Sequence, residues 1–118
     1  MKILTINDII WELSCEYCNN SIDIDIDIKT KNYIIKELNK GNIWIWCDVK
    51  LTGEYLNIKC SDYLSQCSYK NEIDFKNGGY YEDMQNIILN DINKSIEDII
   101  KGYYEILDNY PIQSIPNP

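Results

Sequence analysis

The sequence predicts an α+β fold in which helices pack on one face of a small antiparallel sheet. Two patterns support this fold class. Through residues 43–69, apolar and polar side chains alternate, as in a pair of half-buried strands. Between residues 80 and 107, apolar side chains recur every three or four positions, which is typical of a long amphipathic helix. A chain of 118 residues suits one domain, residues 1–118, with a single modest core.

The first forty residues predict two helices with an extended segment between them. Residues 5–15 show helical spacing of apolar side chains, and Thr5 or Asn7 is available as N-cap. Residues 30–40 predict a second, short helix, with Gly41 as a natural stop. Residues 21–28, SIDIDIDI, alternate strictly. We expect there either an edge strand with its Asp side chains in water, or an ordered loop into the next helix.

The centre of the chain predicts a β-hairpin over about residues 43–64, turning near residues 52–54. Alternation puts Cys47, Val49 and Leu51 on an aliphatic face that helices must cover. The other face of this strand carries Trp44, Trp46, Asp48 and Lys50. In the second strand, the same rule sets Leu56, Ile58 and Cys60 against Tyr55, Asn57 and Lys59.

The C-terminal part predicts a polar connection and then the long helix. The connection covers residues 68–79, with Ile73 and Phe75 as expected apolar anchors and a glycine-rich turn at its end. The helix covers about residues 80–107, and Gly102 would weaken it or end it early. Prolines beyond it exclude a regular helix in the tail.

Aromatic side chains are the first candidates for partner contact. Trp44 and Trp46 lead, because aromatic residues are enriched at binding hot spots. A predicted aromatic patch adds Tyr55, Tyr63, Tyr69, Tyr80 and Tyr81. The alternative is that a helix or a second copy covers this face, in which case both tryptophans belong to a core.

Acidic side chains are the second candidates, since the net charge is −8 and unevenly distributed. Residues 1–28 and 79–118 each carry −5, around a middle of +2. Such a field repels nucleic acid and anionic membranes and favours basic partners, or simply keeps the chain soluble. Asp23, Asp25 and Asp27 would lie about 6.6–6.8 Å apart on a strand, so the row could imitate a phosphate backbone. The other candidate contacts are Asp48, Glu82 and Asp83.

The composition argues against catalysis. All eleven cationic side chains are Lys, so the chain lacks the commonest general base, His, and the bidentate phosphate ligand, Arg. Carboxylates remain as acid–base candidates, but acids this common fall near one another by chance. The acid–base candidates are Asp48, Asp62, Glu82 and Asp83. We expect no enzyme activity, no catalytic residue and no cofactor.

Five cysteines, an odd number, predict a reducing bacterial cytosol rather than a disulfide scaffold. We find no signal-peptide pattern and no apolar run of membrane-spanning length, so we expect a cytoplasmic protein. Cys15-x-x-Cys18 would be half of a zinc site, completed by Cys47, Cys60 or Cys67, but the second pair at defined spacing is missing. We therefore expect no bound metal.

Residues 41–84 resemble a pattern of short accessory proteins of phages and plasmids. The matching pieces are Gly41-Asn42 before Trp44, Trp46-Cys47-Asp48-Val49, Ser61-Asp62-Tyr63-Leu64, Cys67-Ser68-Tyr69, Asp74-Phe75 and Gly79-Tyr80-Tyr81-Glu82-Asp83-Met84. The resemblance covers under half of the chain. It implies a mobile-element gene, from a pool rich in anti-CRISPR and other anti-defence proteins, and it supplies no catalytic residues.

These patterns favour a small inhibitor that binds a host defence protein, or a protein–nucleic-acid complex, without chemistry. Its acidic faces would dock on a basic nucleic-acid channel, and the aromatic patch would anchor the contact. One alternative is a ligand-binding protein that sequesters a nucleotide signal by aromatic stacking, in one version across a homodimer. Another is a structural phage component that assembles into large symmetric oligomers.

Overall fold

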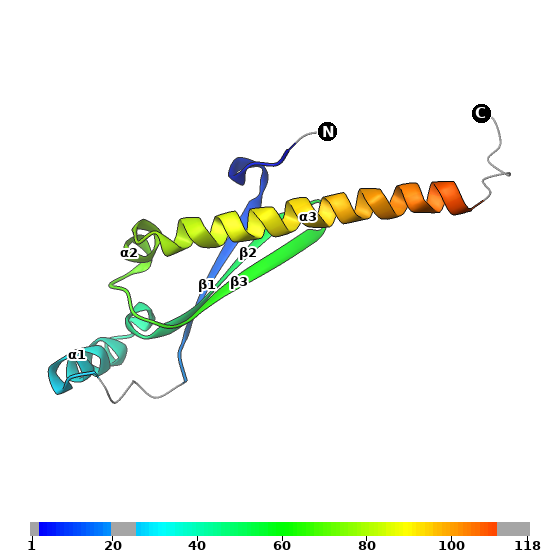
Figure 1. Ribbon diagram of the computed structural model, residues 1–118. Helices are drawn as coiled ribbons and strands as arrows, with labels where there is room; N and C mark the ends of the chain where they lie inside the picture. The colour runs from blue at the N-terminus through cyan, green and yellow to red at the C-terminus, as the bar shows by residue number, and fades with distance from the viewer. Residues whose placement is uncertain (1–2, 20–25, 111–118) are drawn as a thin grey trace.

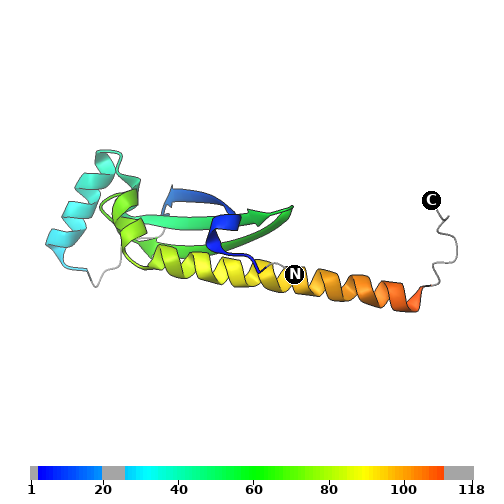
Figure 2. The same cartoon turned by 90° about the horizontal axis from the view of Figure 1, so that it is seen from above.

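The computed structural model describes residues 3–19 and 26–110 and has the expected α+β architecture (Figure 1). Three antiparallel strands lie in the order β1-β2-β3. They are β1 (Ile10–Tyr17), β2 (Cys47–Tyr55) and β3 (Ile58–Cys67). The helices are α1 (Ile28–Asn39), α2 (Glu72–Asn77) and α3 (Tyr80–Asn109), with short 3-10 turns η1 (Ile6–Asp8) and η2 (Ile43–Ile45). α2 and α3 contact each other, and α3 lies along one face of the sheet (Figure 2).

Strand β1 stands where the sequence predicted a helix over residues 5–15, so that prediction was wrong. β1 pairs with β2 along its whole length, from Ile10 opposite Glu54 to Tyr17 opposite Cys47. Its alternate residues Trp11 and Leu13 pack against the main core. The segment satisfies both a helical and an alternating pattern, and the backbone pairing offered by β2 decides between them.

The predicted hairpin is present, but its turn lies at Leu56–Asn57 instead of residues 52–54. Both turn residues have positive φ, 46° and 69°, as a two-residue type I′ turn requires. Gly53 is instead a strand residue whose missing side chain makes room for α3. A Cβ at Gly53 would lie 2.7 Å from Cγ2 of Ile88. The turn position also carries Tyr55 toward the core, not outward as alternation had suggested.

The main core lies between the inner face of the sheet and the helices. Leu51 of β2 is fully buried, as are Ile88 and Ile92 of α3. Phe75 of α2 closes one end of this core and is surrounded by three aromatic rings. Its ring centroid lies 5.5 Å from that of Trp44, 5.1 Å from that of Tyr69 and 5.9 Å from that of Tyr81. Phe75 is the predicted anchor, whereas Ile73 is exposed, so its prediction as an anchor was wrong.

A second, smaller core joins α1 to the sheet. It consists of Cys18, Ile34, Ile45 and Trp46, with Leu38 packed against it. α1 matches the helix predicted over residues 30–40, and Gly41 follows it with φ 87°. Asp27 and Ile28 form the start of this helix, so they do not belong to an edge strand. Residues 21–25 of the predicted edge segment, including Asp23 and Asp25, lie outside the described residues.

Helix α3 continues through Gly102 to Asn109 and is longer than the sheet beneath it. Its 30 residues correspond to about 45 Å. In Figures 1 and 2 it runs on past the hairpin tip. The radius of gyration is therefore 21.4 Å, where a compact chain of this length would have about 13–14 Å. Within the described residues, no helix combines the length and apolarity needed to cross a membrane.

Candidate protein-binding site on the open face of the sheet

The outer face of the sheet is polar, and no helix of the described chain lies over it (Figures 1 and 2). Strand alternation selects the side chains that point outward from the three strands. Those that line the two depressions of this face are Glu12, Ser14 and Glu16 of β1, Asp48, Lys50 and Thr52 of β2, and Lys59, Ser61, Tyr63 and Ser65 of β3. Ile10 and Glu54, opposite each other in the register, point outward by the same rule. We call this surface the open face.

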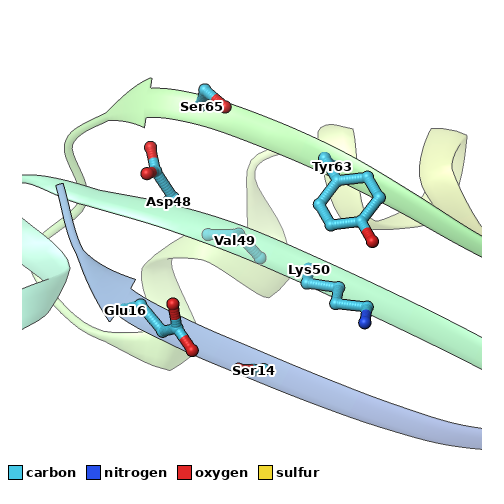
Figure 3. Close-up of a pocket in the computed structure, with 7 residues that line it drawn as sticks. All are labelled: Ser14, Glu16, Asp48, Val49, Lys50, Tyr63 and Ser65. Atoms are coloured by element: carbon cyan, nitrogen blue, oxygen red, sulfur yellow. The ribbon is translucent and has the colours of Figure 1, made fainter.

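A depression of about 250 Å³ lies on the open face (Figure 3). Its lining comes from all three strands: Ser14, Glu16, Asp48, Val49, Lys50, Tyr63 and Ser65. A second depression of about 340 Å³ shares Ser14, Glu16 and Lys50 with it and extends toward Thr52 and Lys59. Together they form one continuous polar surface with a single aromatic ring, that of Tyr63.

Two carboxylates occupy opposite positions on neighbouring strands of this surface, with the Asp48 carboxylate turned toward β3 (Figure 3). Glu16 of β1 and Asp48 of β2 are directly opposite in the register. Like charges in such cross-strand positions destabilise a sheet. Asp48 is held in place because its Oδ1 accepts a hydrogen bond from the backbone N–H of Gln66, at 3.0 Å. Gln66 has φ 53° and lies where the β2–β3 register shifts, so a bulge fixes the carboxylate.

Lys50, two residues after Asp48 on β2, contacts an aromatic ring. Nζ of Lys50 lies 5.6 Å from the ring centroid of Tyr63. In the described part of the chain, no ion pair neutralises Glu16 or Asp48. A cationic group such as a Lys or Arg side chain would find two carboxylates without ion-pair partners in the described chain, whereas a phosphate would be repelled by both. The chemistry of the open face therefore suits a basic protein surface.

Two predicted contact residues lie on this face, and one important residue was missed. Asp48 and Tyr63 are where strand alternation placed them. Glu16 was not among the candidates, because residues 5–15 were predicted as a helix and no strand was expected to reach Glu16. The alternation of Trp11, Leu13 and Cys15 with polar neighbours was the signal that could have identified it.

The predicted aromatic patch is not a surface, because most of its members are core residues. Trp46 is buried in the second core, and Trp44, Tyr69 and Tyr81 pack around Phe75. The alternative interpretation, in which the tryptophans are core residues, is the correct one. They lie in and after η2 instead of in a strand, so the alternation rule did not apply to them. Tyr80 is exposed but separate from Tyr63.

The remaining acidic candidates have local structural roles. Glu82 and Asp83 are exposed in the first turn of α3, where the helix dipole favours negative charge. Asp27 is the N-cap of α1, and its carboxylate accepts hydrogen bonds from the backbone N–H and the hydroxyl of Thr30, at 2.8 Å and 3.1 Å. These bonds hold the pKa of Asp27 below its ordinary value. None of these three belongs to the open face.

Three cysteines gather inside the sheet, but not in the predicted pairing. Sγ of Cys47 lies 3.7 Å from Sγ of Cys67, and the Cys15 thiol is also hydrogen-bonded to Cys47. Cys18 lies apart in the second core, so Cys15-x-x-Cys18 does not form one site. In residues 3–19 and 26–110, no group of three or more Cys, His, Asp or Glu side chains is arranged to hold a metal ion.

Comparison with protein-family models, curated proteins and solved structures gives no match to this chain. The functional argument therefore rests on the residues of the open face and on the charge of the chain.

Proposed function

We propose that this protein is a non-enzymatic, mobile-element inhibitor that binds a basic, nucleic-acid-handling protein of a bacterial host. The open face presents carboxylates to the surface that the partner uses for nucleic acid. The mobile-element origin rests on the sequence resemblance over residues 41–84. The mode of binding rests on the geometry of the open face.

The observation that carries this proposal is the unneutralised pair of Glu16 and Asp48. Glu16 and Asp48 stand opposite each other on adjacent strands without an ion-pair partner in the described chain, a placement that does not favour the fold. A bulge amide nevertheless holds Asp48 in place. Gln66, which supplies that amide, has a left-handed backbone conformation, and such strained backbone is common at functional sites. Tyr63 beside the pair supplies the apolar contact area that interface hot spots commonly contain.

The charge of the whole chain supports the same partner class. A net charge of −8 accelerates encounter with a basic surface and disfavours direct binding to nucleic acid. The outer side of α3 adds exposed acids on the far side of the sheet: Asp83, Asp91, Glu97, Asp98, Glu105 and Asp108. These acids steer a basic partner toward the protein, and the open face makes the contact.

The test begins with recovery of partners by the tagged full-length protein from a bacterial lysate at low salt. The dissociation constant of each recovered complex is then measured with the double variant Glu16→Gln, Asp48→Asn. We expect it to rise about tenfold or more. We also expect nucleic acid to compete with this protein for the partner, and added salt to weaken the complex.

A matched control separates direct contact by the open face from long-range electrostatic attraction by the acids of α3. Asp98→Asn on α3 removes one charge without touching the open face. It should change the dissociation constant by less than Asp48→Asn does, because a distant charge acts mainly on the association rate. Equal affinity of wild type and double variant, or failure of nucleic acid to compete, would contradict the proposal.

A further inference from the structure

The distal half of α3 and the hairpin tip expose one continuous apolar surface. We call it the distal apolar surface. Its members are Leu56 at the hairpin tip and Ile96, Ile99, Tyr103, Ile106 and Tyr110 along and after α3. It continues the side of α3 that packs on the sheet through Met84, Ile88 and Ile92, but it lies where the sheet has ended (Figure 1).

The spacing along α3 indicates what covers this surface. From Ile92 the apolar positions follow at intervals of four, three, four, three and four residues, ending at Tyr110. Packing on the sheet ends near Ile96, yet the pattern keeps the seven-residue period that a helix uses to pack against another helix. All charges of this stretch lie on the other sides of the helix: Asp91, Lys94, Glu97, Asp98, Lys101, Glu105 and Asp108.

The hairpin tip adds a second, independent observation. Leu56 has φ 46°, a backbone conformation that Gly and Asn adopt easily but that strains a residue such as Leu. Its side chain is nevertheless 76% exposed. It lines an apolar groove of about 320 Å³ together with Tyr55, Ile58, Ile96, Ile99 and Ile100. An exposed apolar side chain at a strained turn position indicates that another molecule contacts Leu56.

We infer that a second copy of this chain covers the distal apolar surface, in an antiparallel two-fold dimer. Each helix would lay its distal half against the distal half of the other. The end of the partner's helix, with its Tyr110, would then meet the hairpin-tip groove beside Leu56. This inference is independent of the proposed function, because the open face lies on the other side of the sheet.

The position of the sheet selects the antiparallel arrangement. The sheet lies on the same side of α3 as the distal apolar surface. In a parallel pair joined by this side, the two sheets would compete for the same space between the helices. In an antiparallel pair, each sheet lies beyond the end of the other copy's helix. The distal half of the partner's helix then packs on the same side of α3 as the sheet and continues where the sheet stops. The same surface serves both copies, as two-fold symmetry requires.

The exposed area is sufficient for such a dimer. Large apolar side chains at about 60% exposure present on the order of 100 Å² each, so the six members offer roughly 600 Å² per copy. Stable interfaces bury about 600–1,000 Å² per partner. A second helix therefore covers an area of the right size, and the aromatic rings at positions 103 and 110 supply much of it.

The test compares two neighbouring tyrosines by molar mass in solution. Tyr103 and Tyr104 are 59% and 61% exposed, but only Tyr103 lies on the distal apolar surface. Their rings contact each other at 6.1 Å, so either substitution by Glu loses that contact equally. We expect the wild type and Tyr104→Glu to have twice the 13.9 kDa chain mass, and Tyr103→Glu to have the mass of one chain with unchanged helix content.

Two further variants keep the inference testable if Tyr103→Glu fails to fold. Leu56→Asn suits the turn, so we expect the variant to fold with unchanged helix content and with a dimer dissociation constant raised about tenfold or more. A photo-crosslinking residue at position 110 should attach to the partner's hairpin tip. The inference would be overturned if the wild type had the mass of one chain, or if Tyr104→Glu had the same effect as Tyr103→Glu. Crosslinks between position 110 of one copy and position 110 of the other would also overturn it.

Discussion

Gly53 is the residue on which the packing of α3 against the sheet depends. A Cβ there would lie 2.7 Å from Cγ2 of Ile88, 2.9 Å from Cγ2 of Ile9 and 2.9 Å from Cζ3 of Trp11. These atoms belong to the helix, the N-terminal segment and β1. We predict that Gly53→Ala lowers the free energy of unfolding by about 1–3 kcal/mol, as overpacking does in well-packed cores. Chemical denaturation measures this change.

Gly102 provides the opposite case on the same chain. A Cβ there meets no atom within 4 Å, and the residue lies inside α3. Gly102→Ala should therefore raise stability by about 0.5–1 kcal/mol through helix propensity. If both substitutions shifted stability in the same direction, the close approach of α3 would not explain why position 53 is a glycine.

The thiols of Cys47 and Cys67 illustrate how contact at the residue scale sets reactivity. Their hydrogen bond lowers the pKa of Cys67. The same bond, together with burial, raises the pKa of Cys47. Burial also raises the pKa values of Cys15 and Cys60. We predict that iodoacetamide alkylates Cys67 first as the pH rises, which peptide mass spectrometry of timed samples would reveal. Earlier labelling of Cys47 would contradict this assignment.

At the scale of elements, the cap of α1 has a defined pH dependence. Hydrogen bonds from Thr30 lower the pKa of Asp27 in the folded state. A group with a depressed pKa stabilises the fold above its unfolded pKa, and this contribution disappears as the pH falls through the folded value. We predict that α1 loses its first turn on acidification in that range. The Thr30 amide shift in an NMR titration follows this change.

Asp27→Asn is the matched control for this titration. Asn caps helices as well as Asp does but has no proton to gain. The variant should keep α1 and lose the acid transition at Thr30. Persistence of the transition in Asp27→Asn would assign it to another group.

The sequence predicted correctly the elements that have a long apolar repeat or a recognisable stop residue at one end. α3 repeats its apolar spacing over eight turns, and α1 ends before Gly41, so both were found. β1 was missed, since its eight residues fit two periodicities and only pairing with β2 excludes the helix. The hairpin turn was misplaced for a related reason. Thr52–Gly53 looks like a turn, but the glycine serves packing against Ile88.

The candidate site followed the same division. Asp48 and Tyr63 lie on the open face, because alternation along β2 and β3 determines which side chains point outward, and their role as contacts stays a prediction. Glu16 required β1 to be known as a strand. Trp44 and Trp46 were assigned to a surface because the strand was expected to begin at residue 43. It begins at Cys47, after a 3-10 turn that directs both rings inward.

At the scale of the whole molecule, apolar and charged functions lie on different sides of α3. One side packs on the sheet and then continues as the distal apolar surface. The other carries the acids that give the C-terminal region its net −5. Partner capture and self-association should therefore respond to salt in opposite directions. Salt screens attraction between the acids and a basic partner, but it also screens repulsion between two copies that each carry −8.

Sedimentation equilibrium of the purified full-length chain at about 0.1 M and about 1 M salt tests the role of α3 most directly, because these conditions change the screening length from about 10 Å to about 3 Å. We predict a dimer in both solutions, with a smaller dissociation constant at high salt. A mass of 13.9 kDa at every concentration, or a dimer that dissociates when salt is added, would contradict the account.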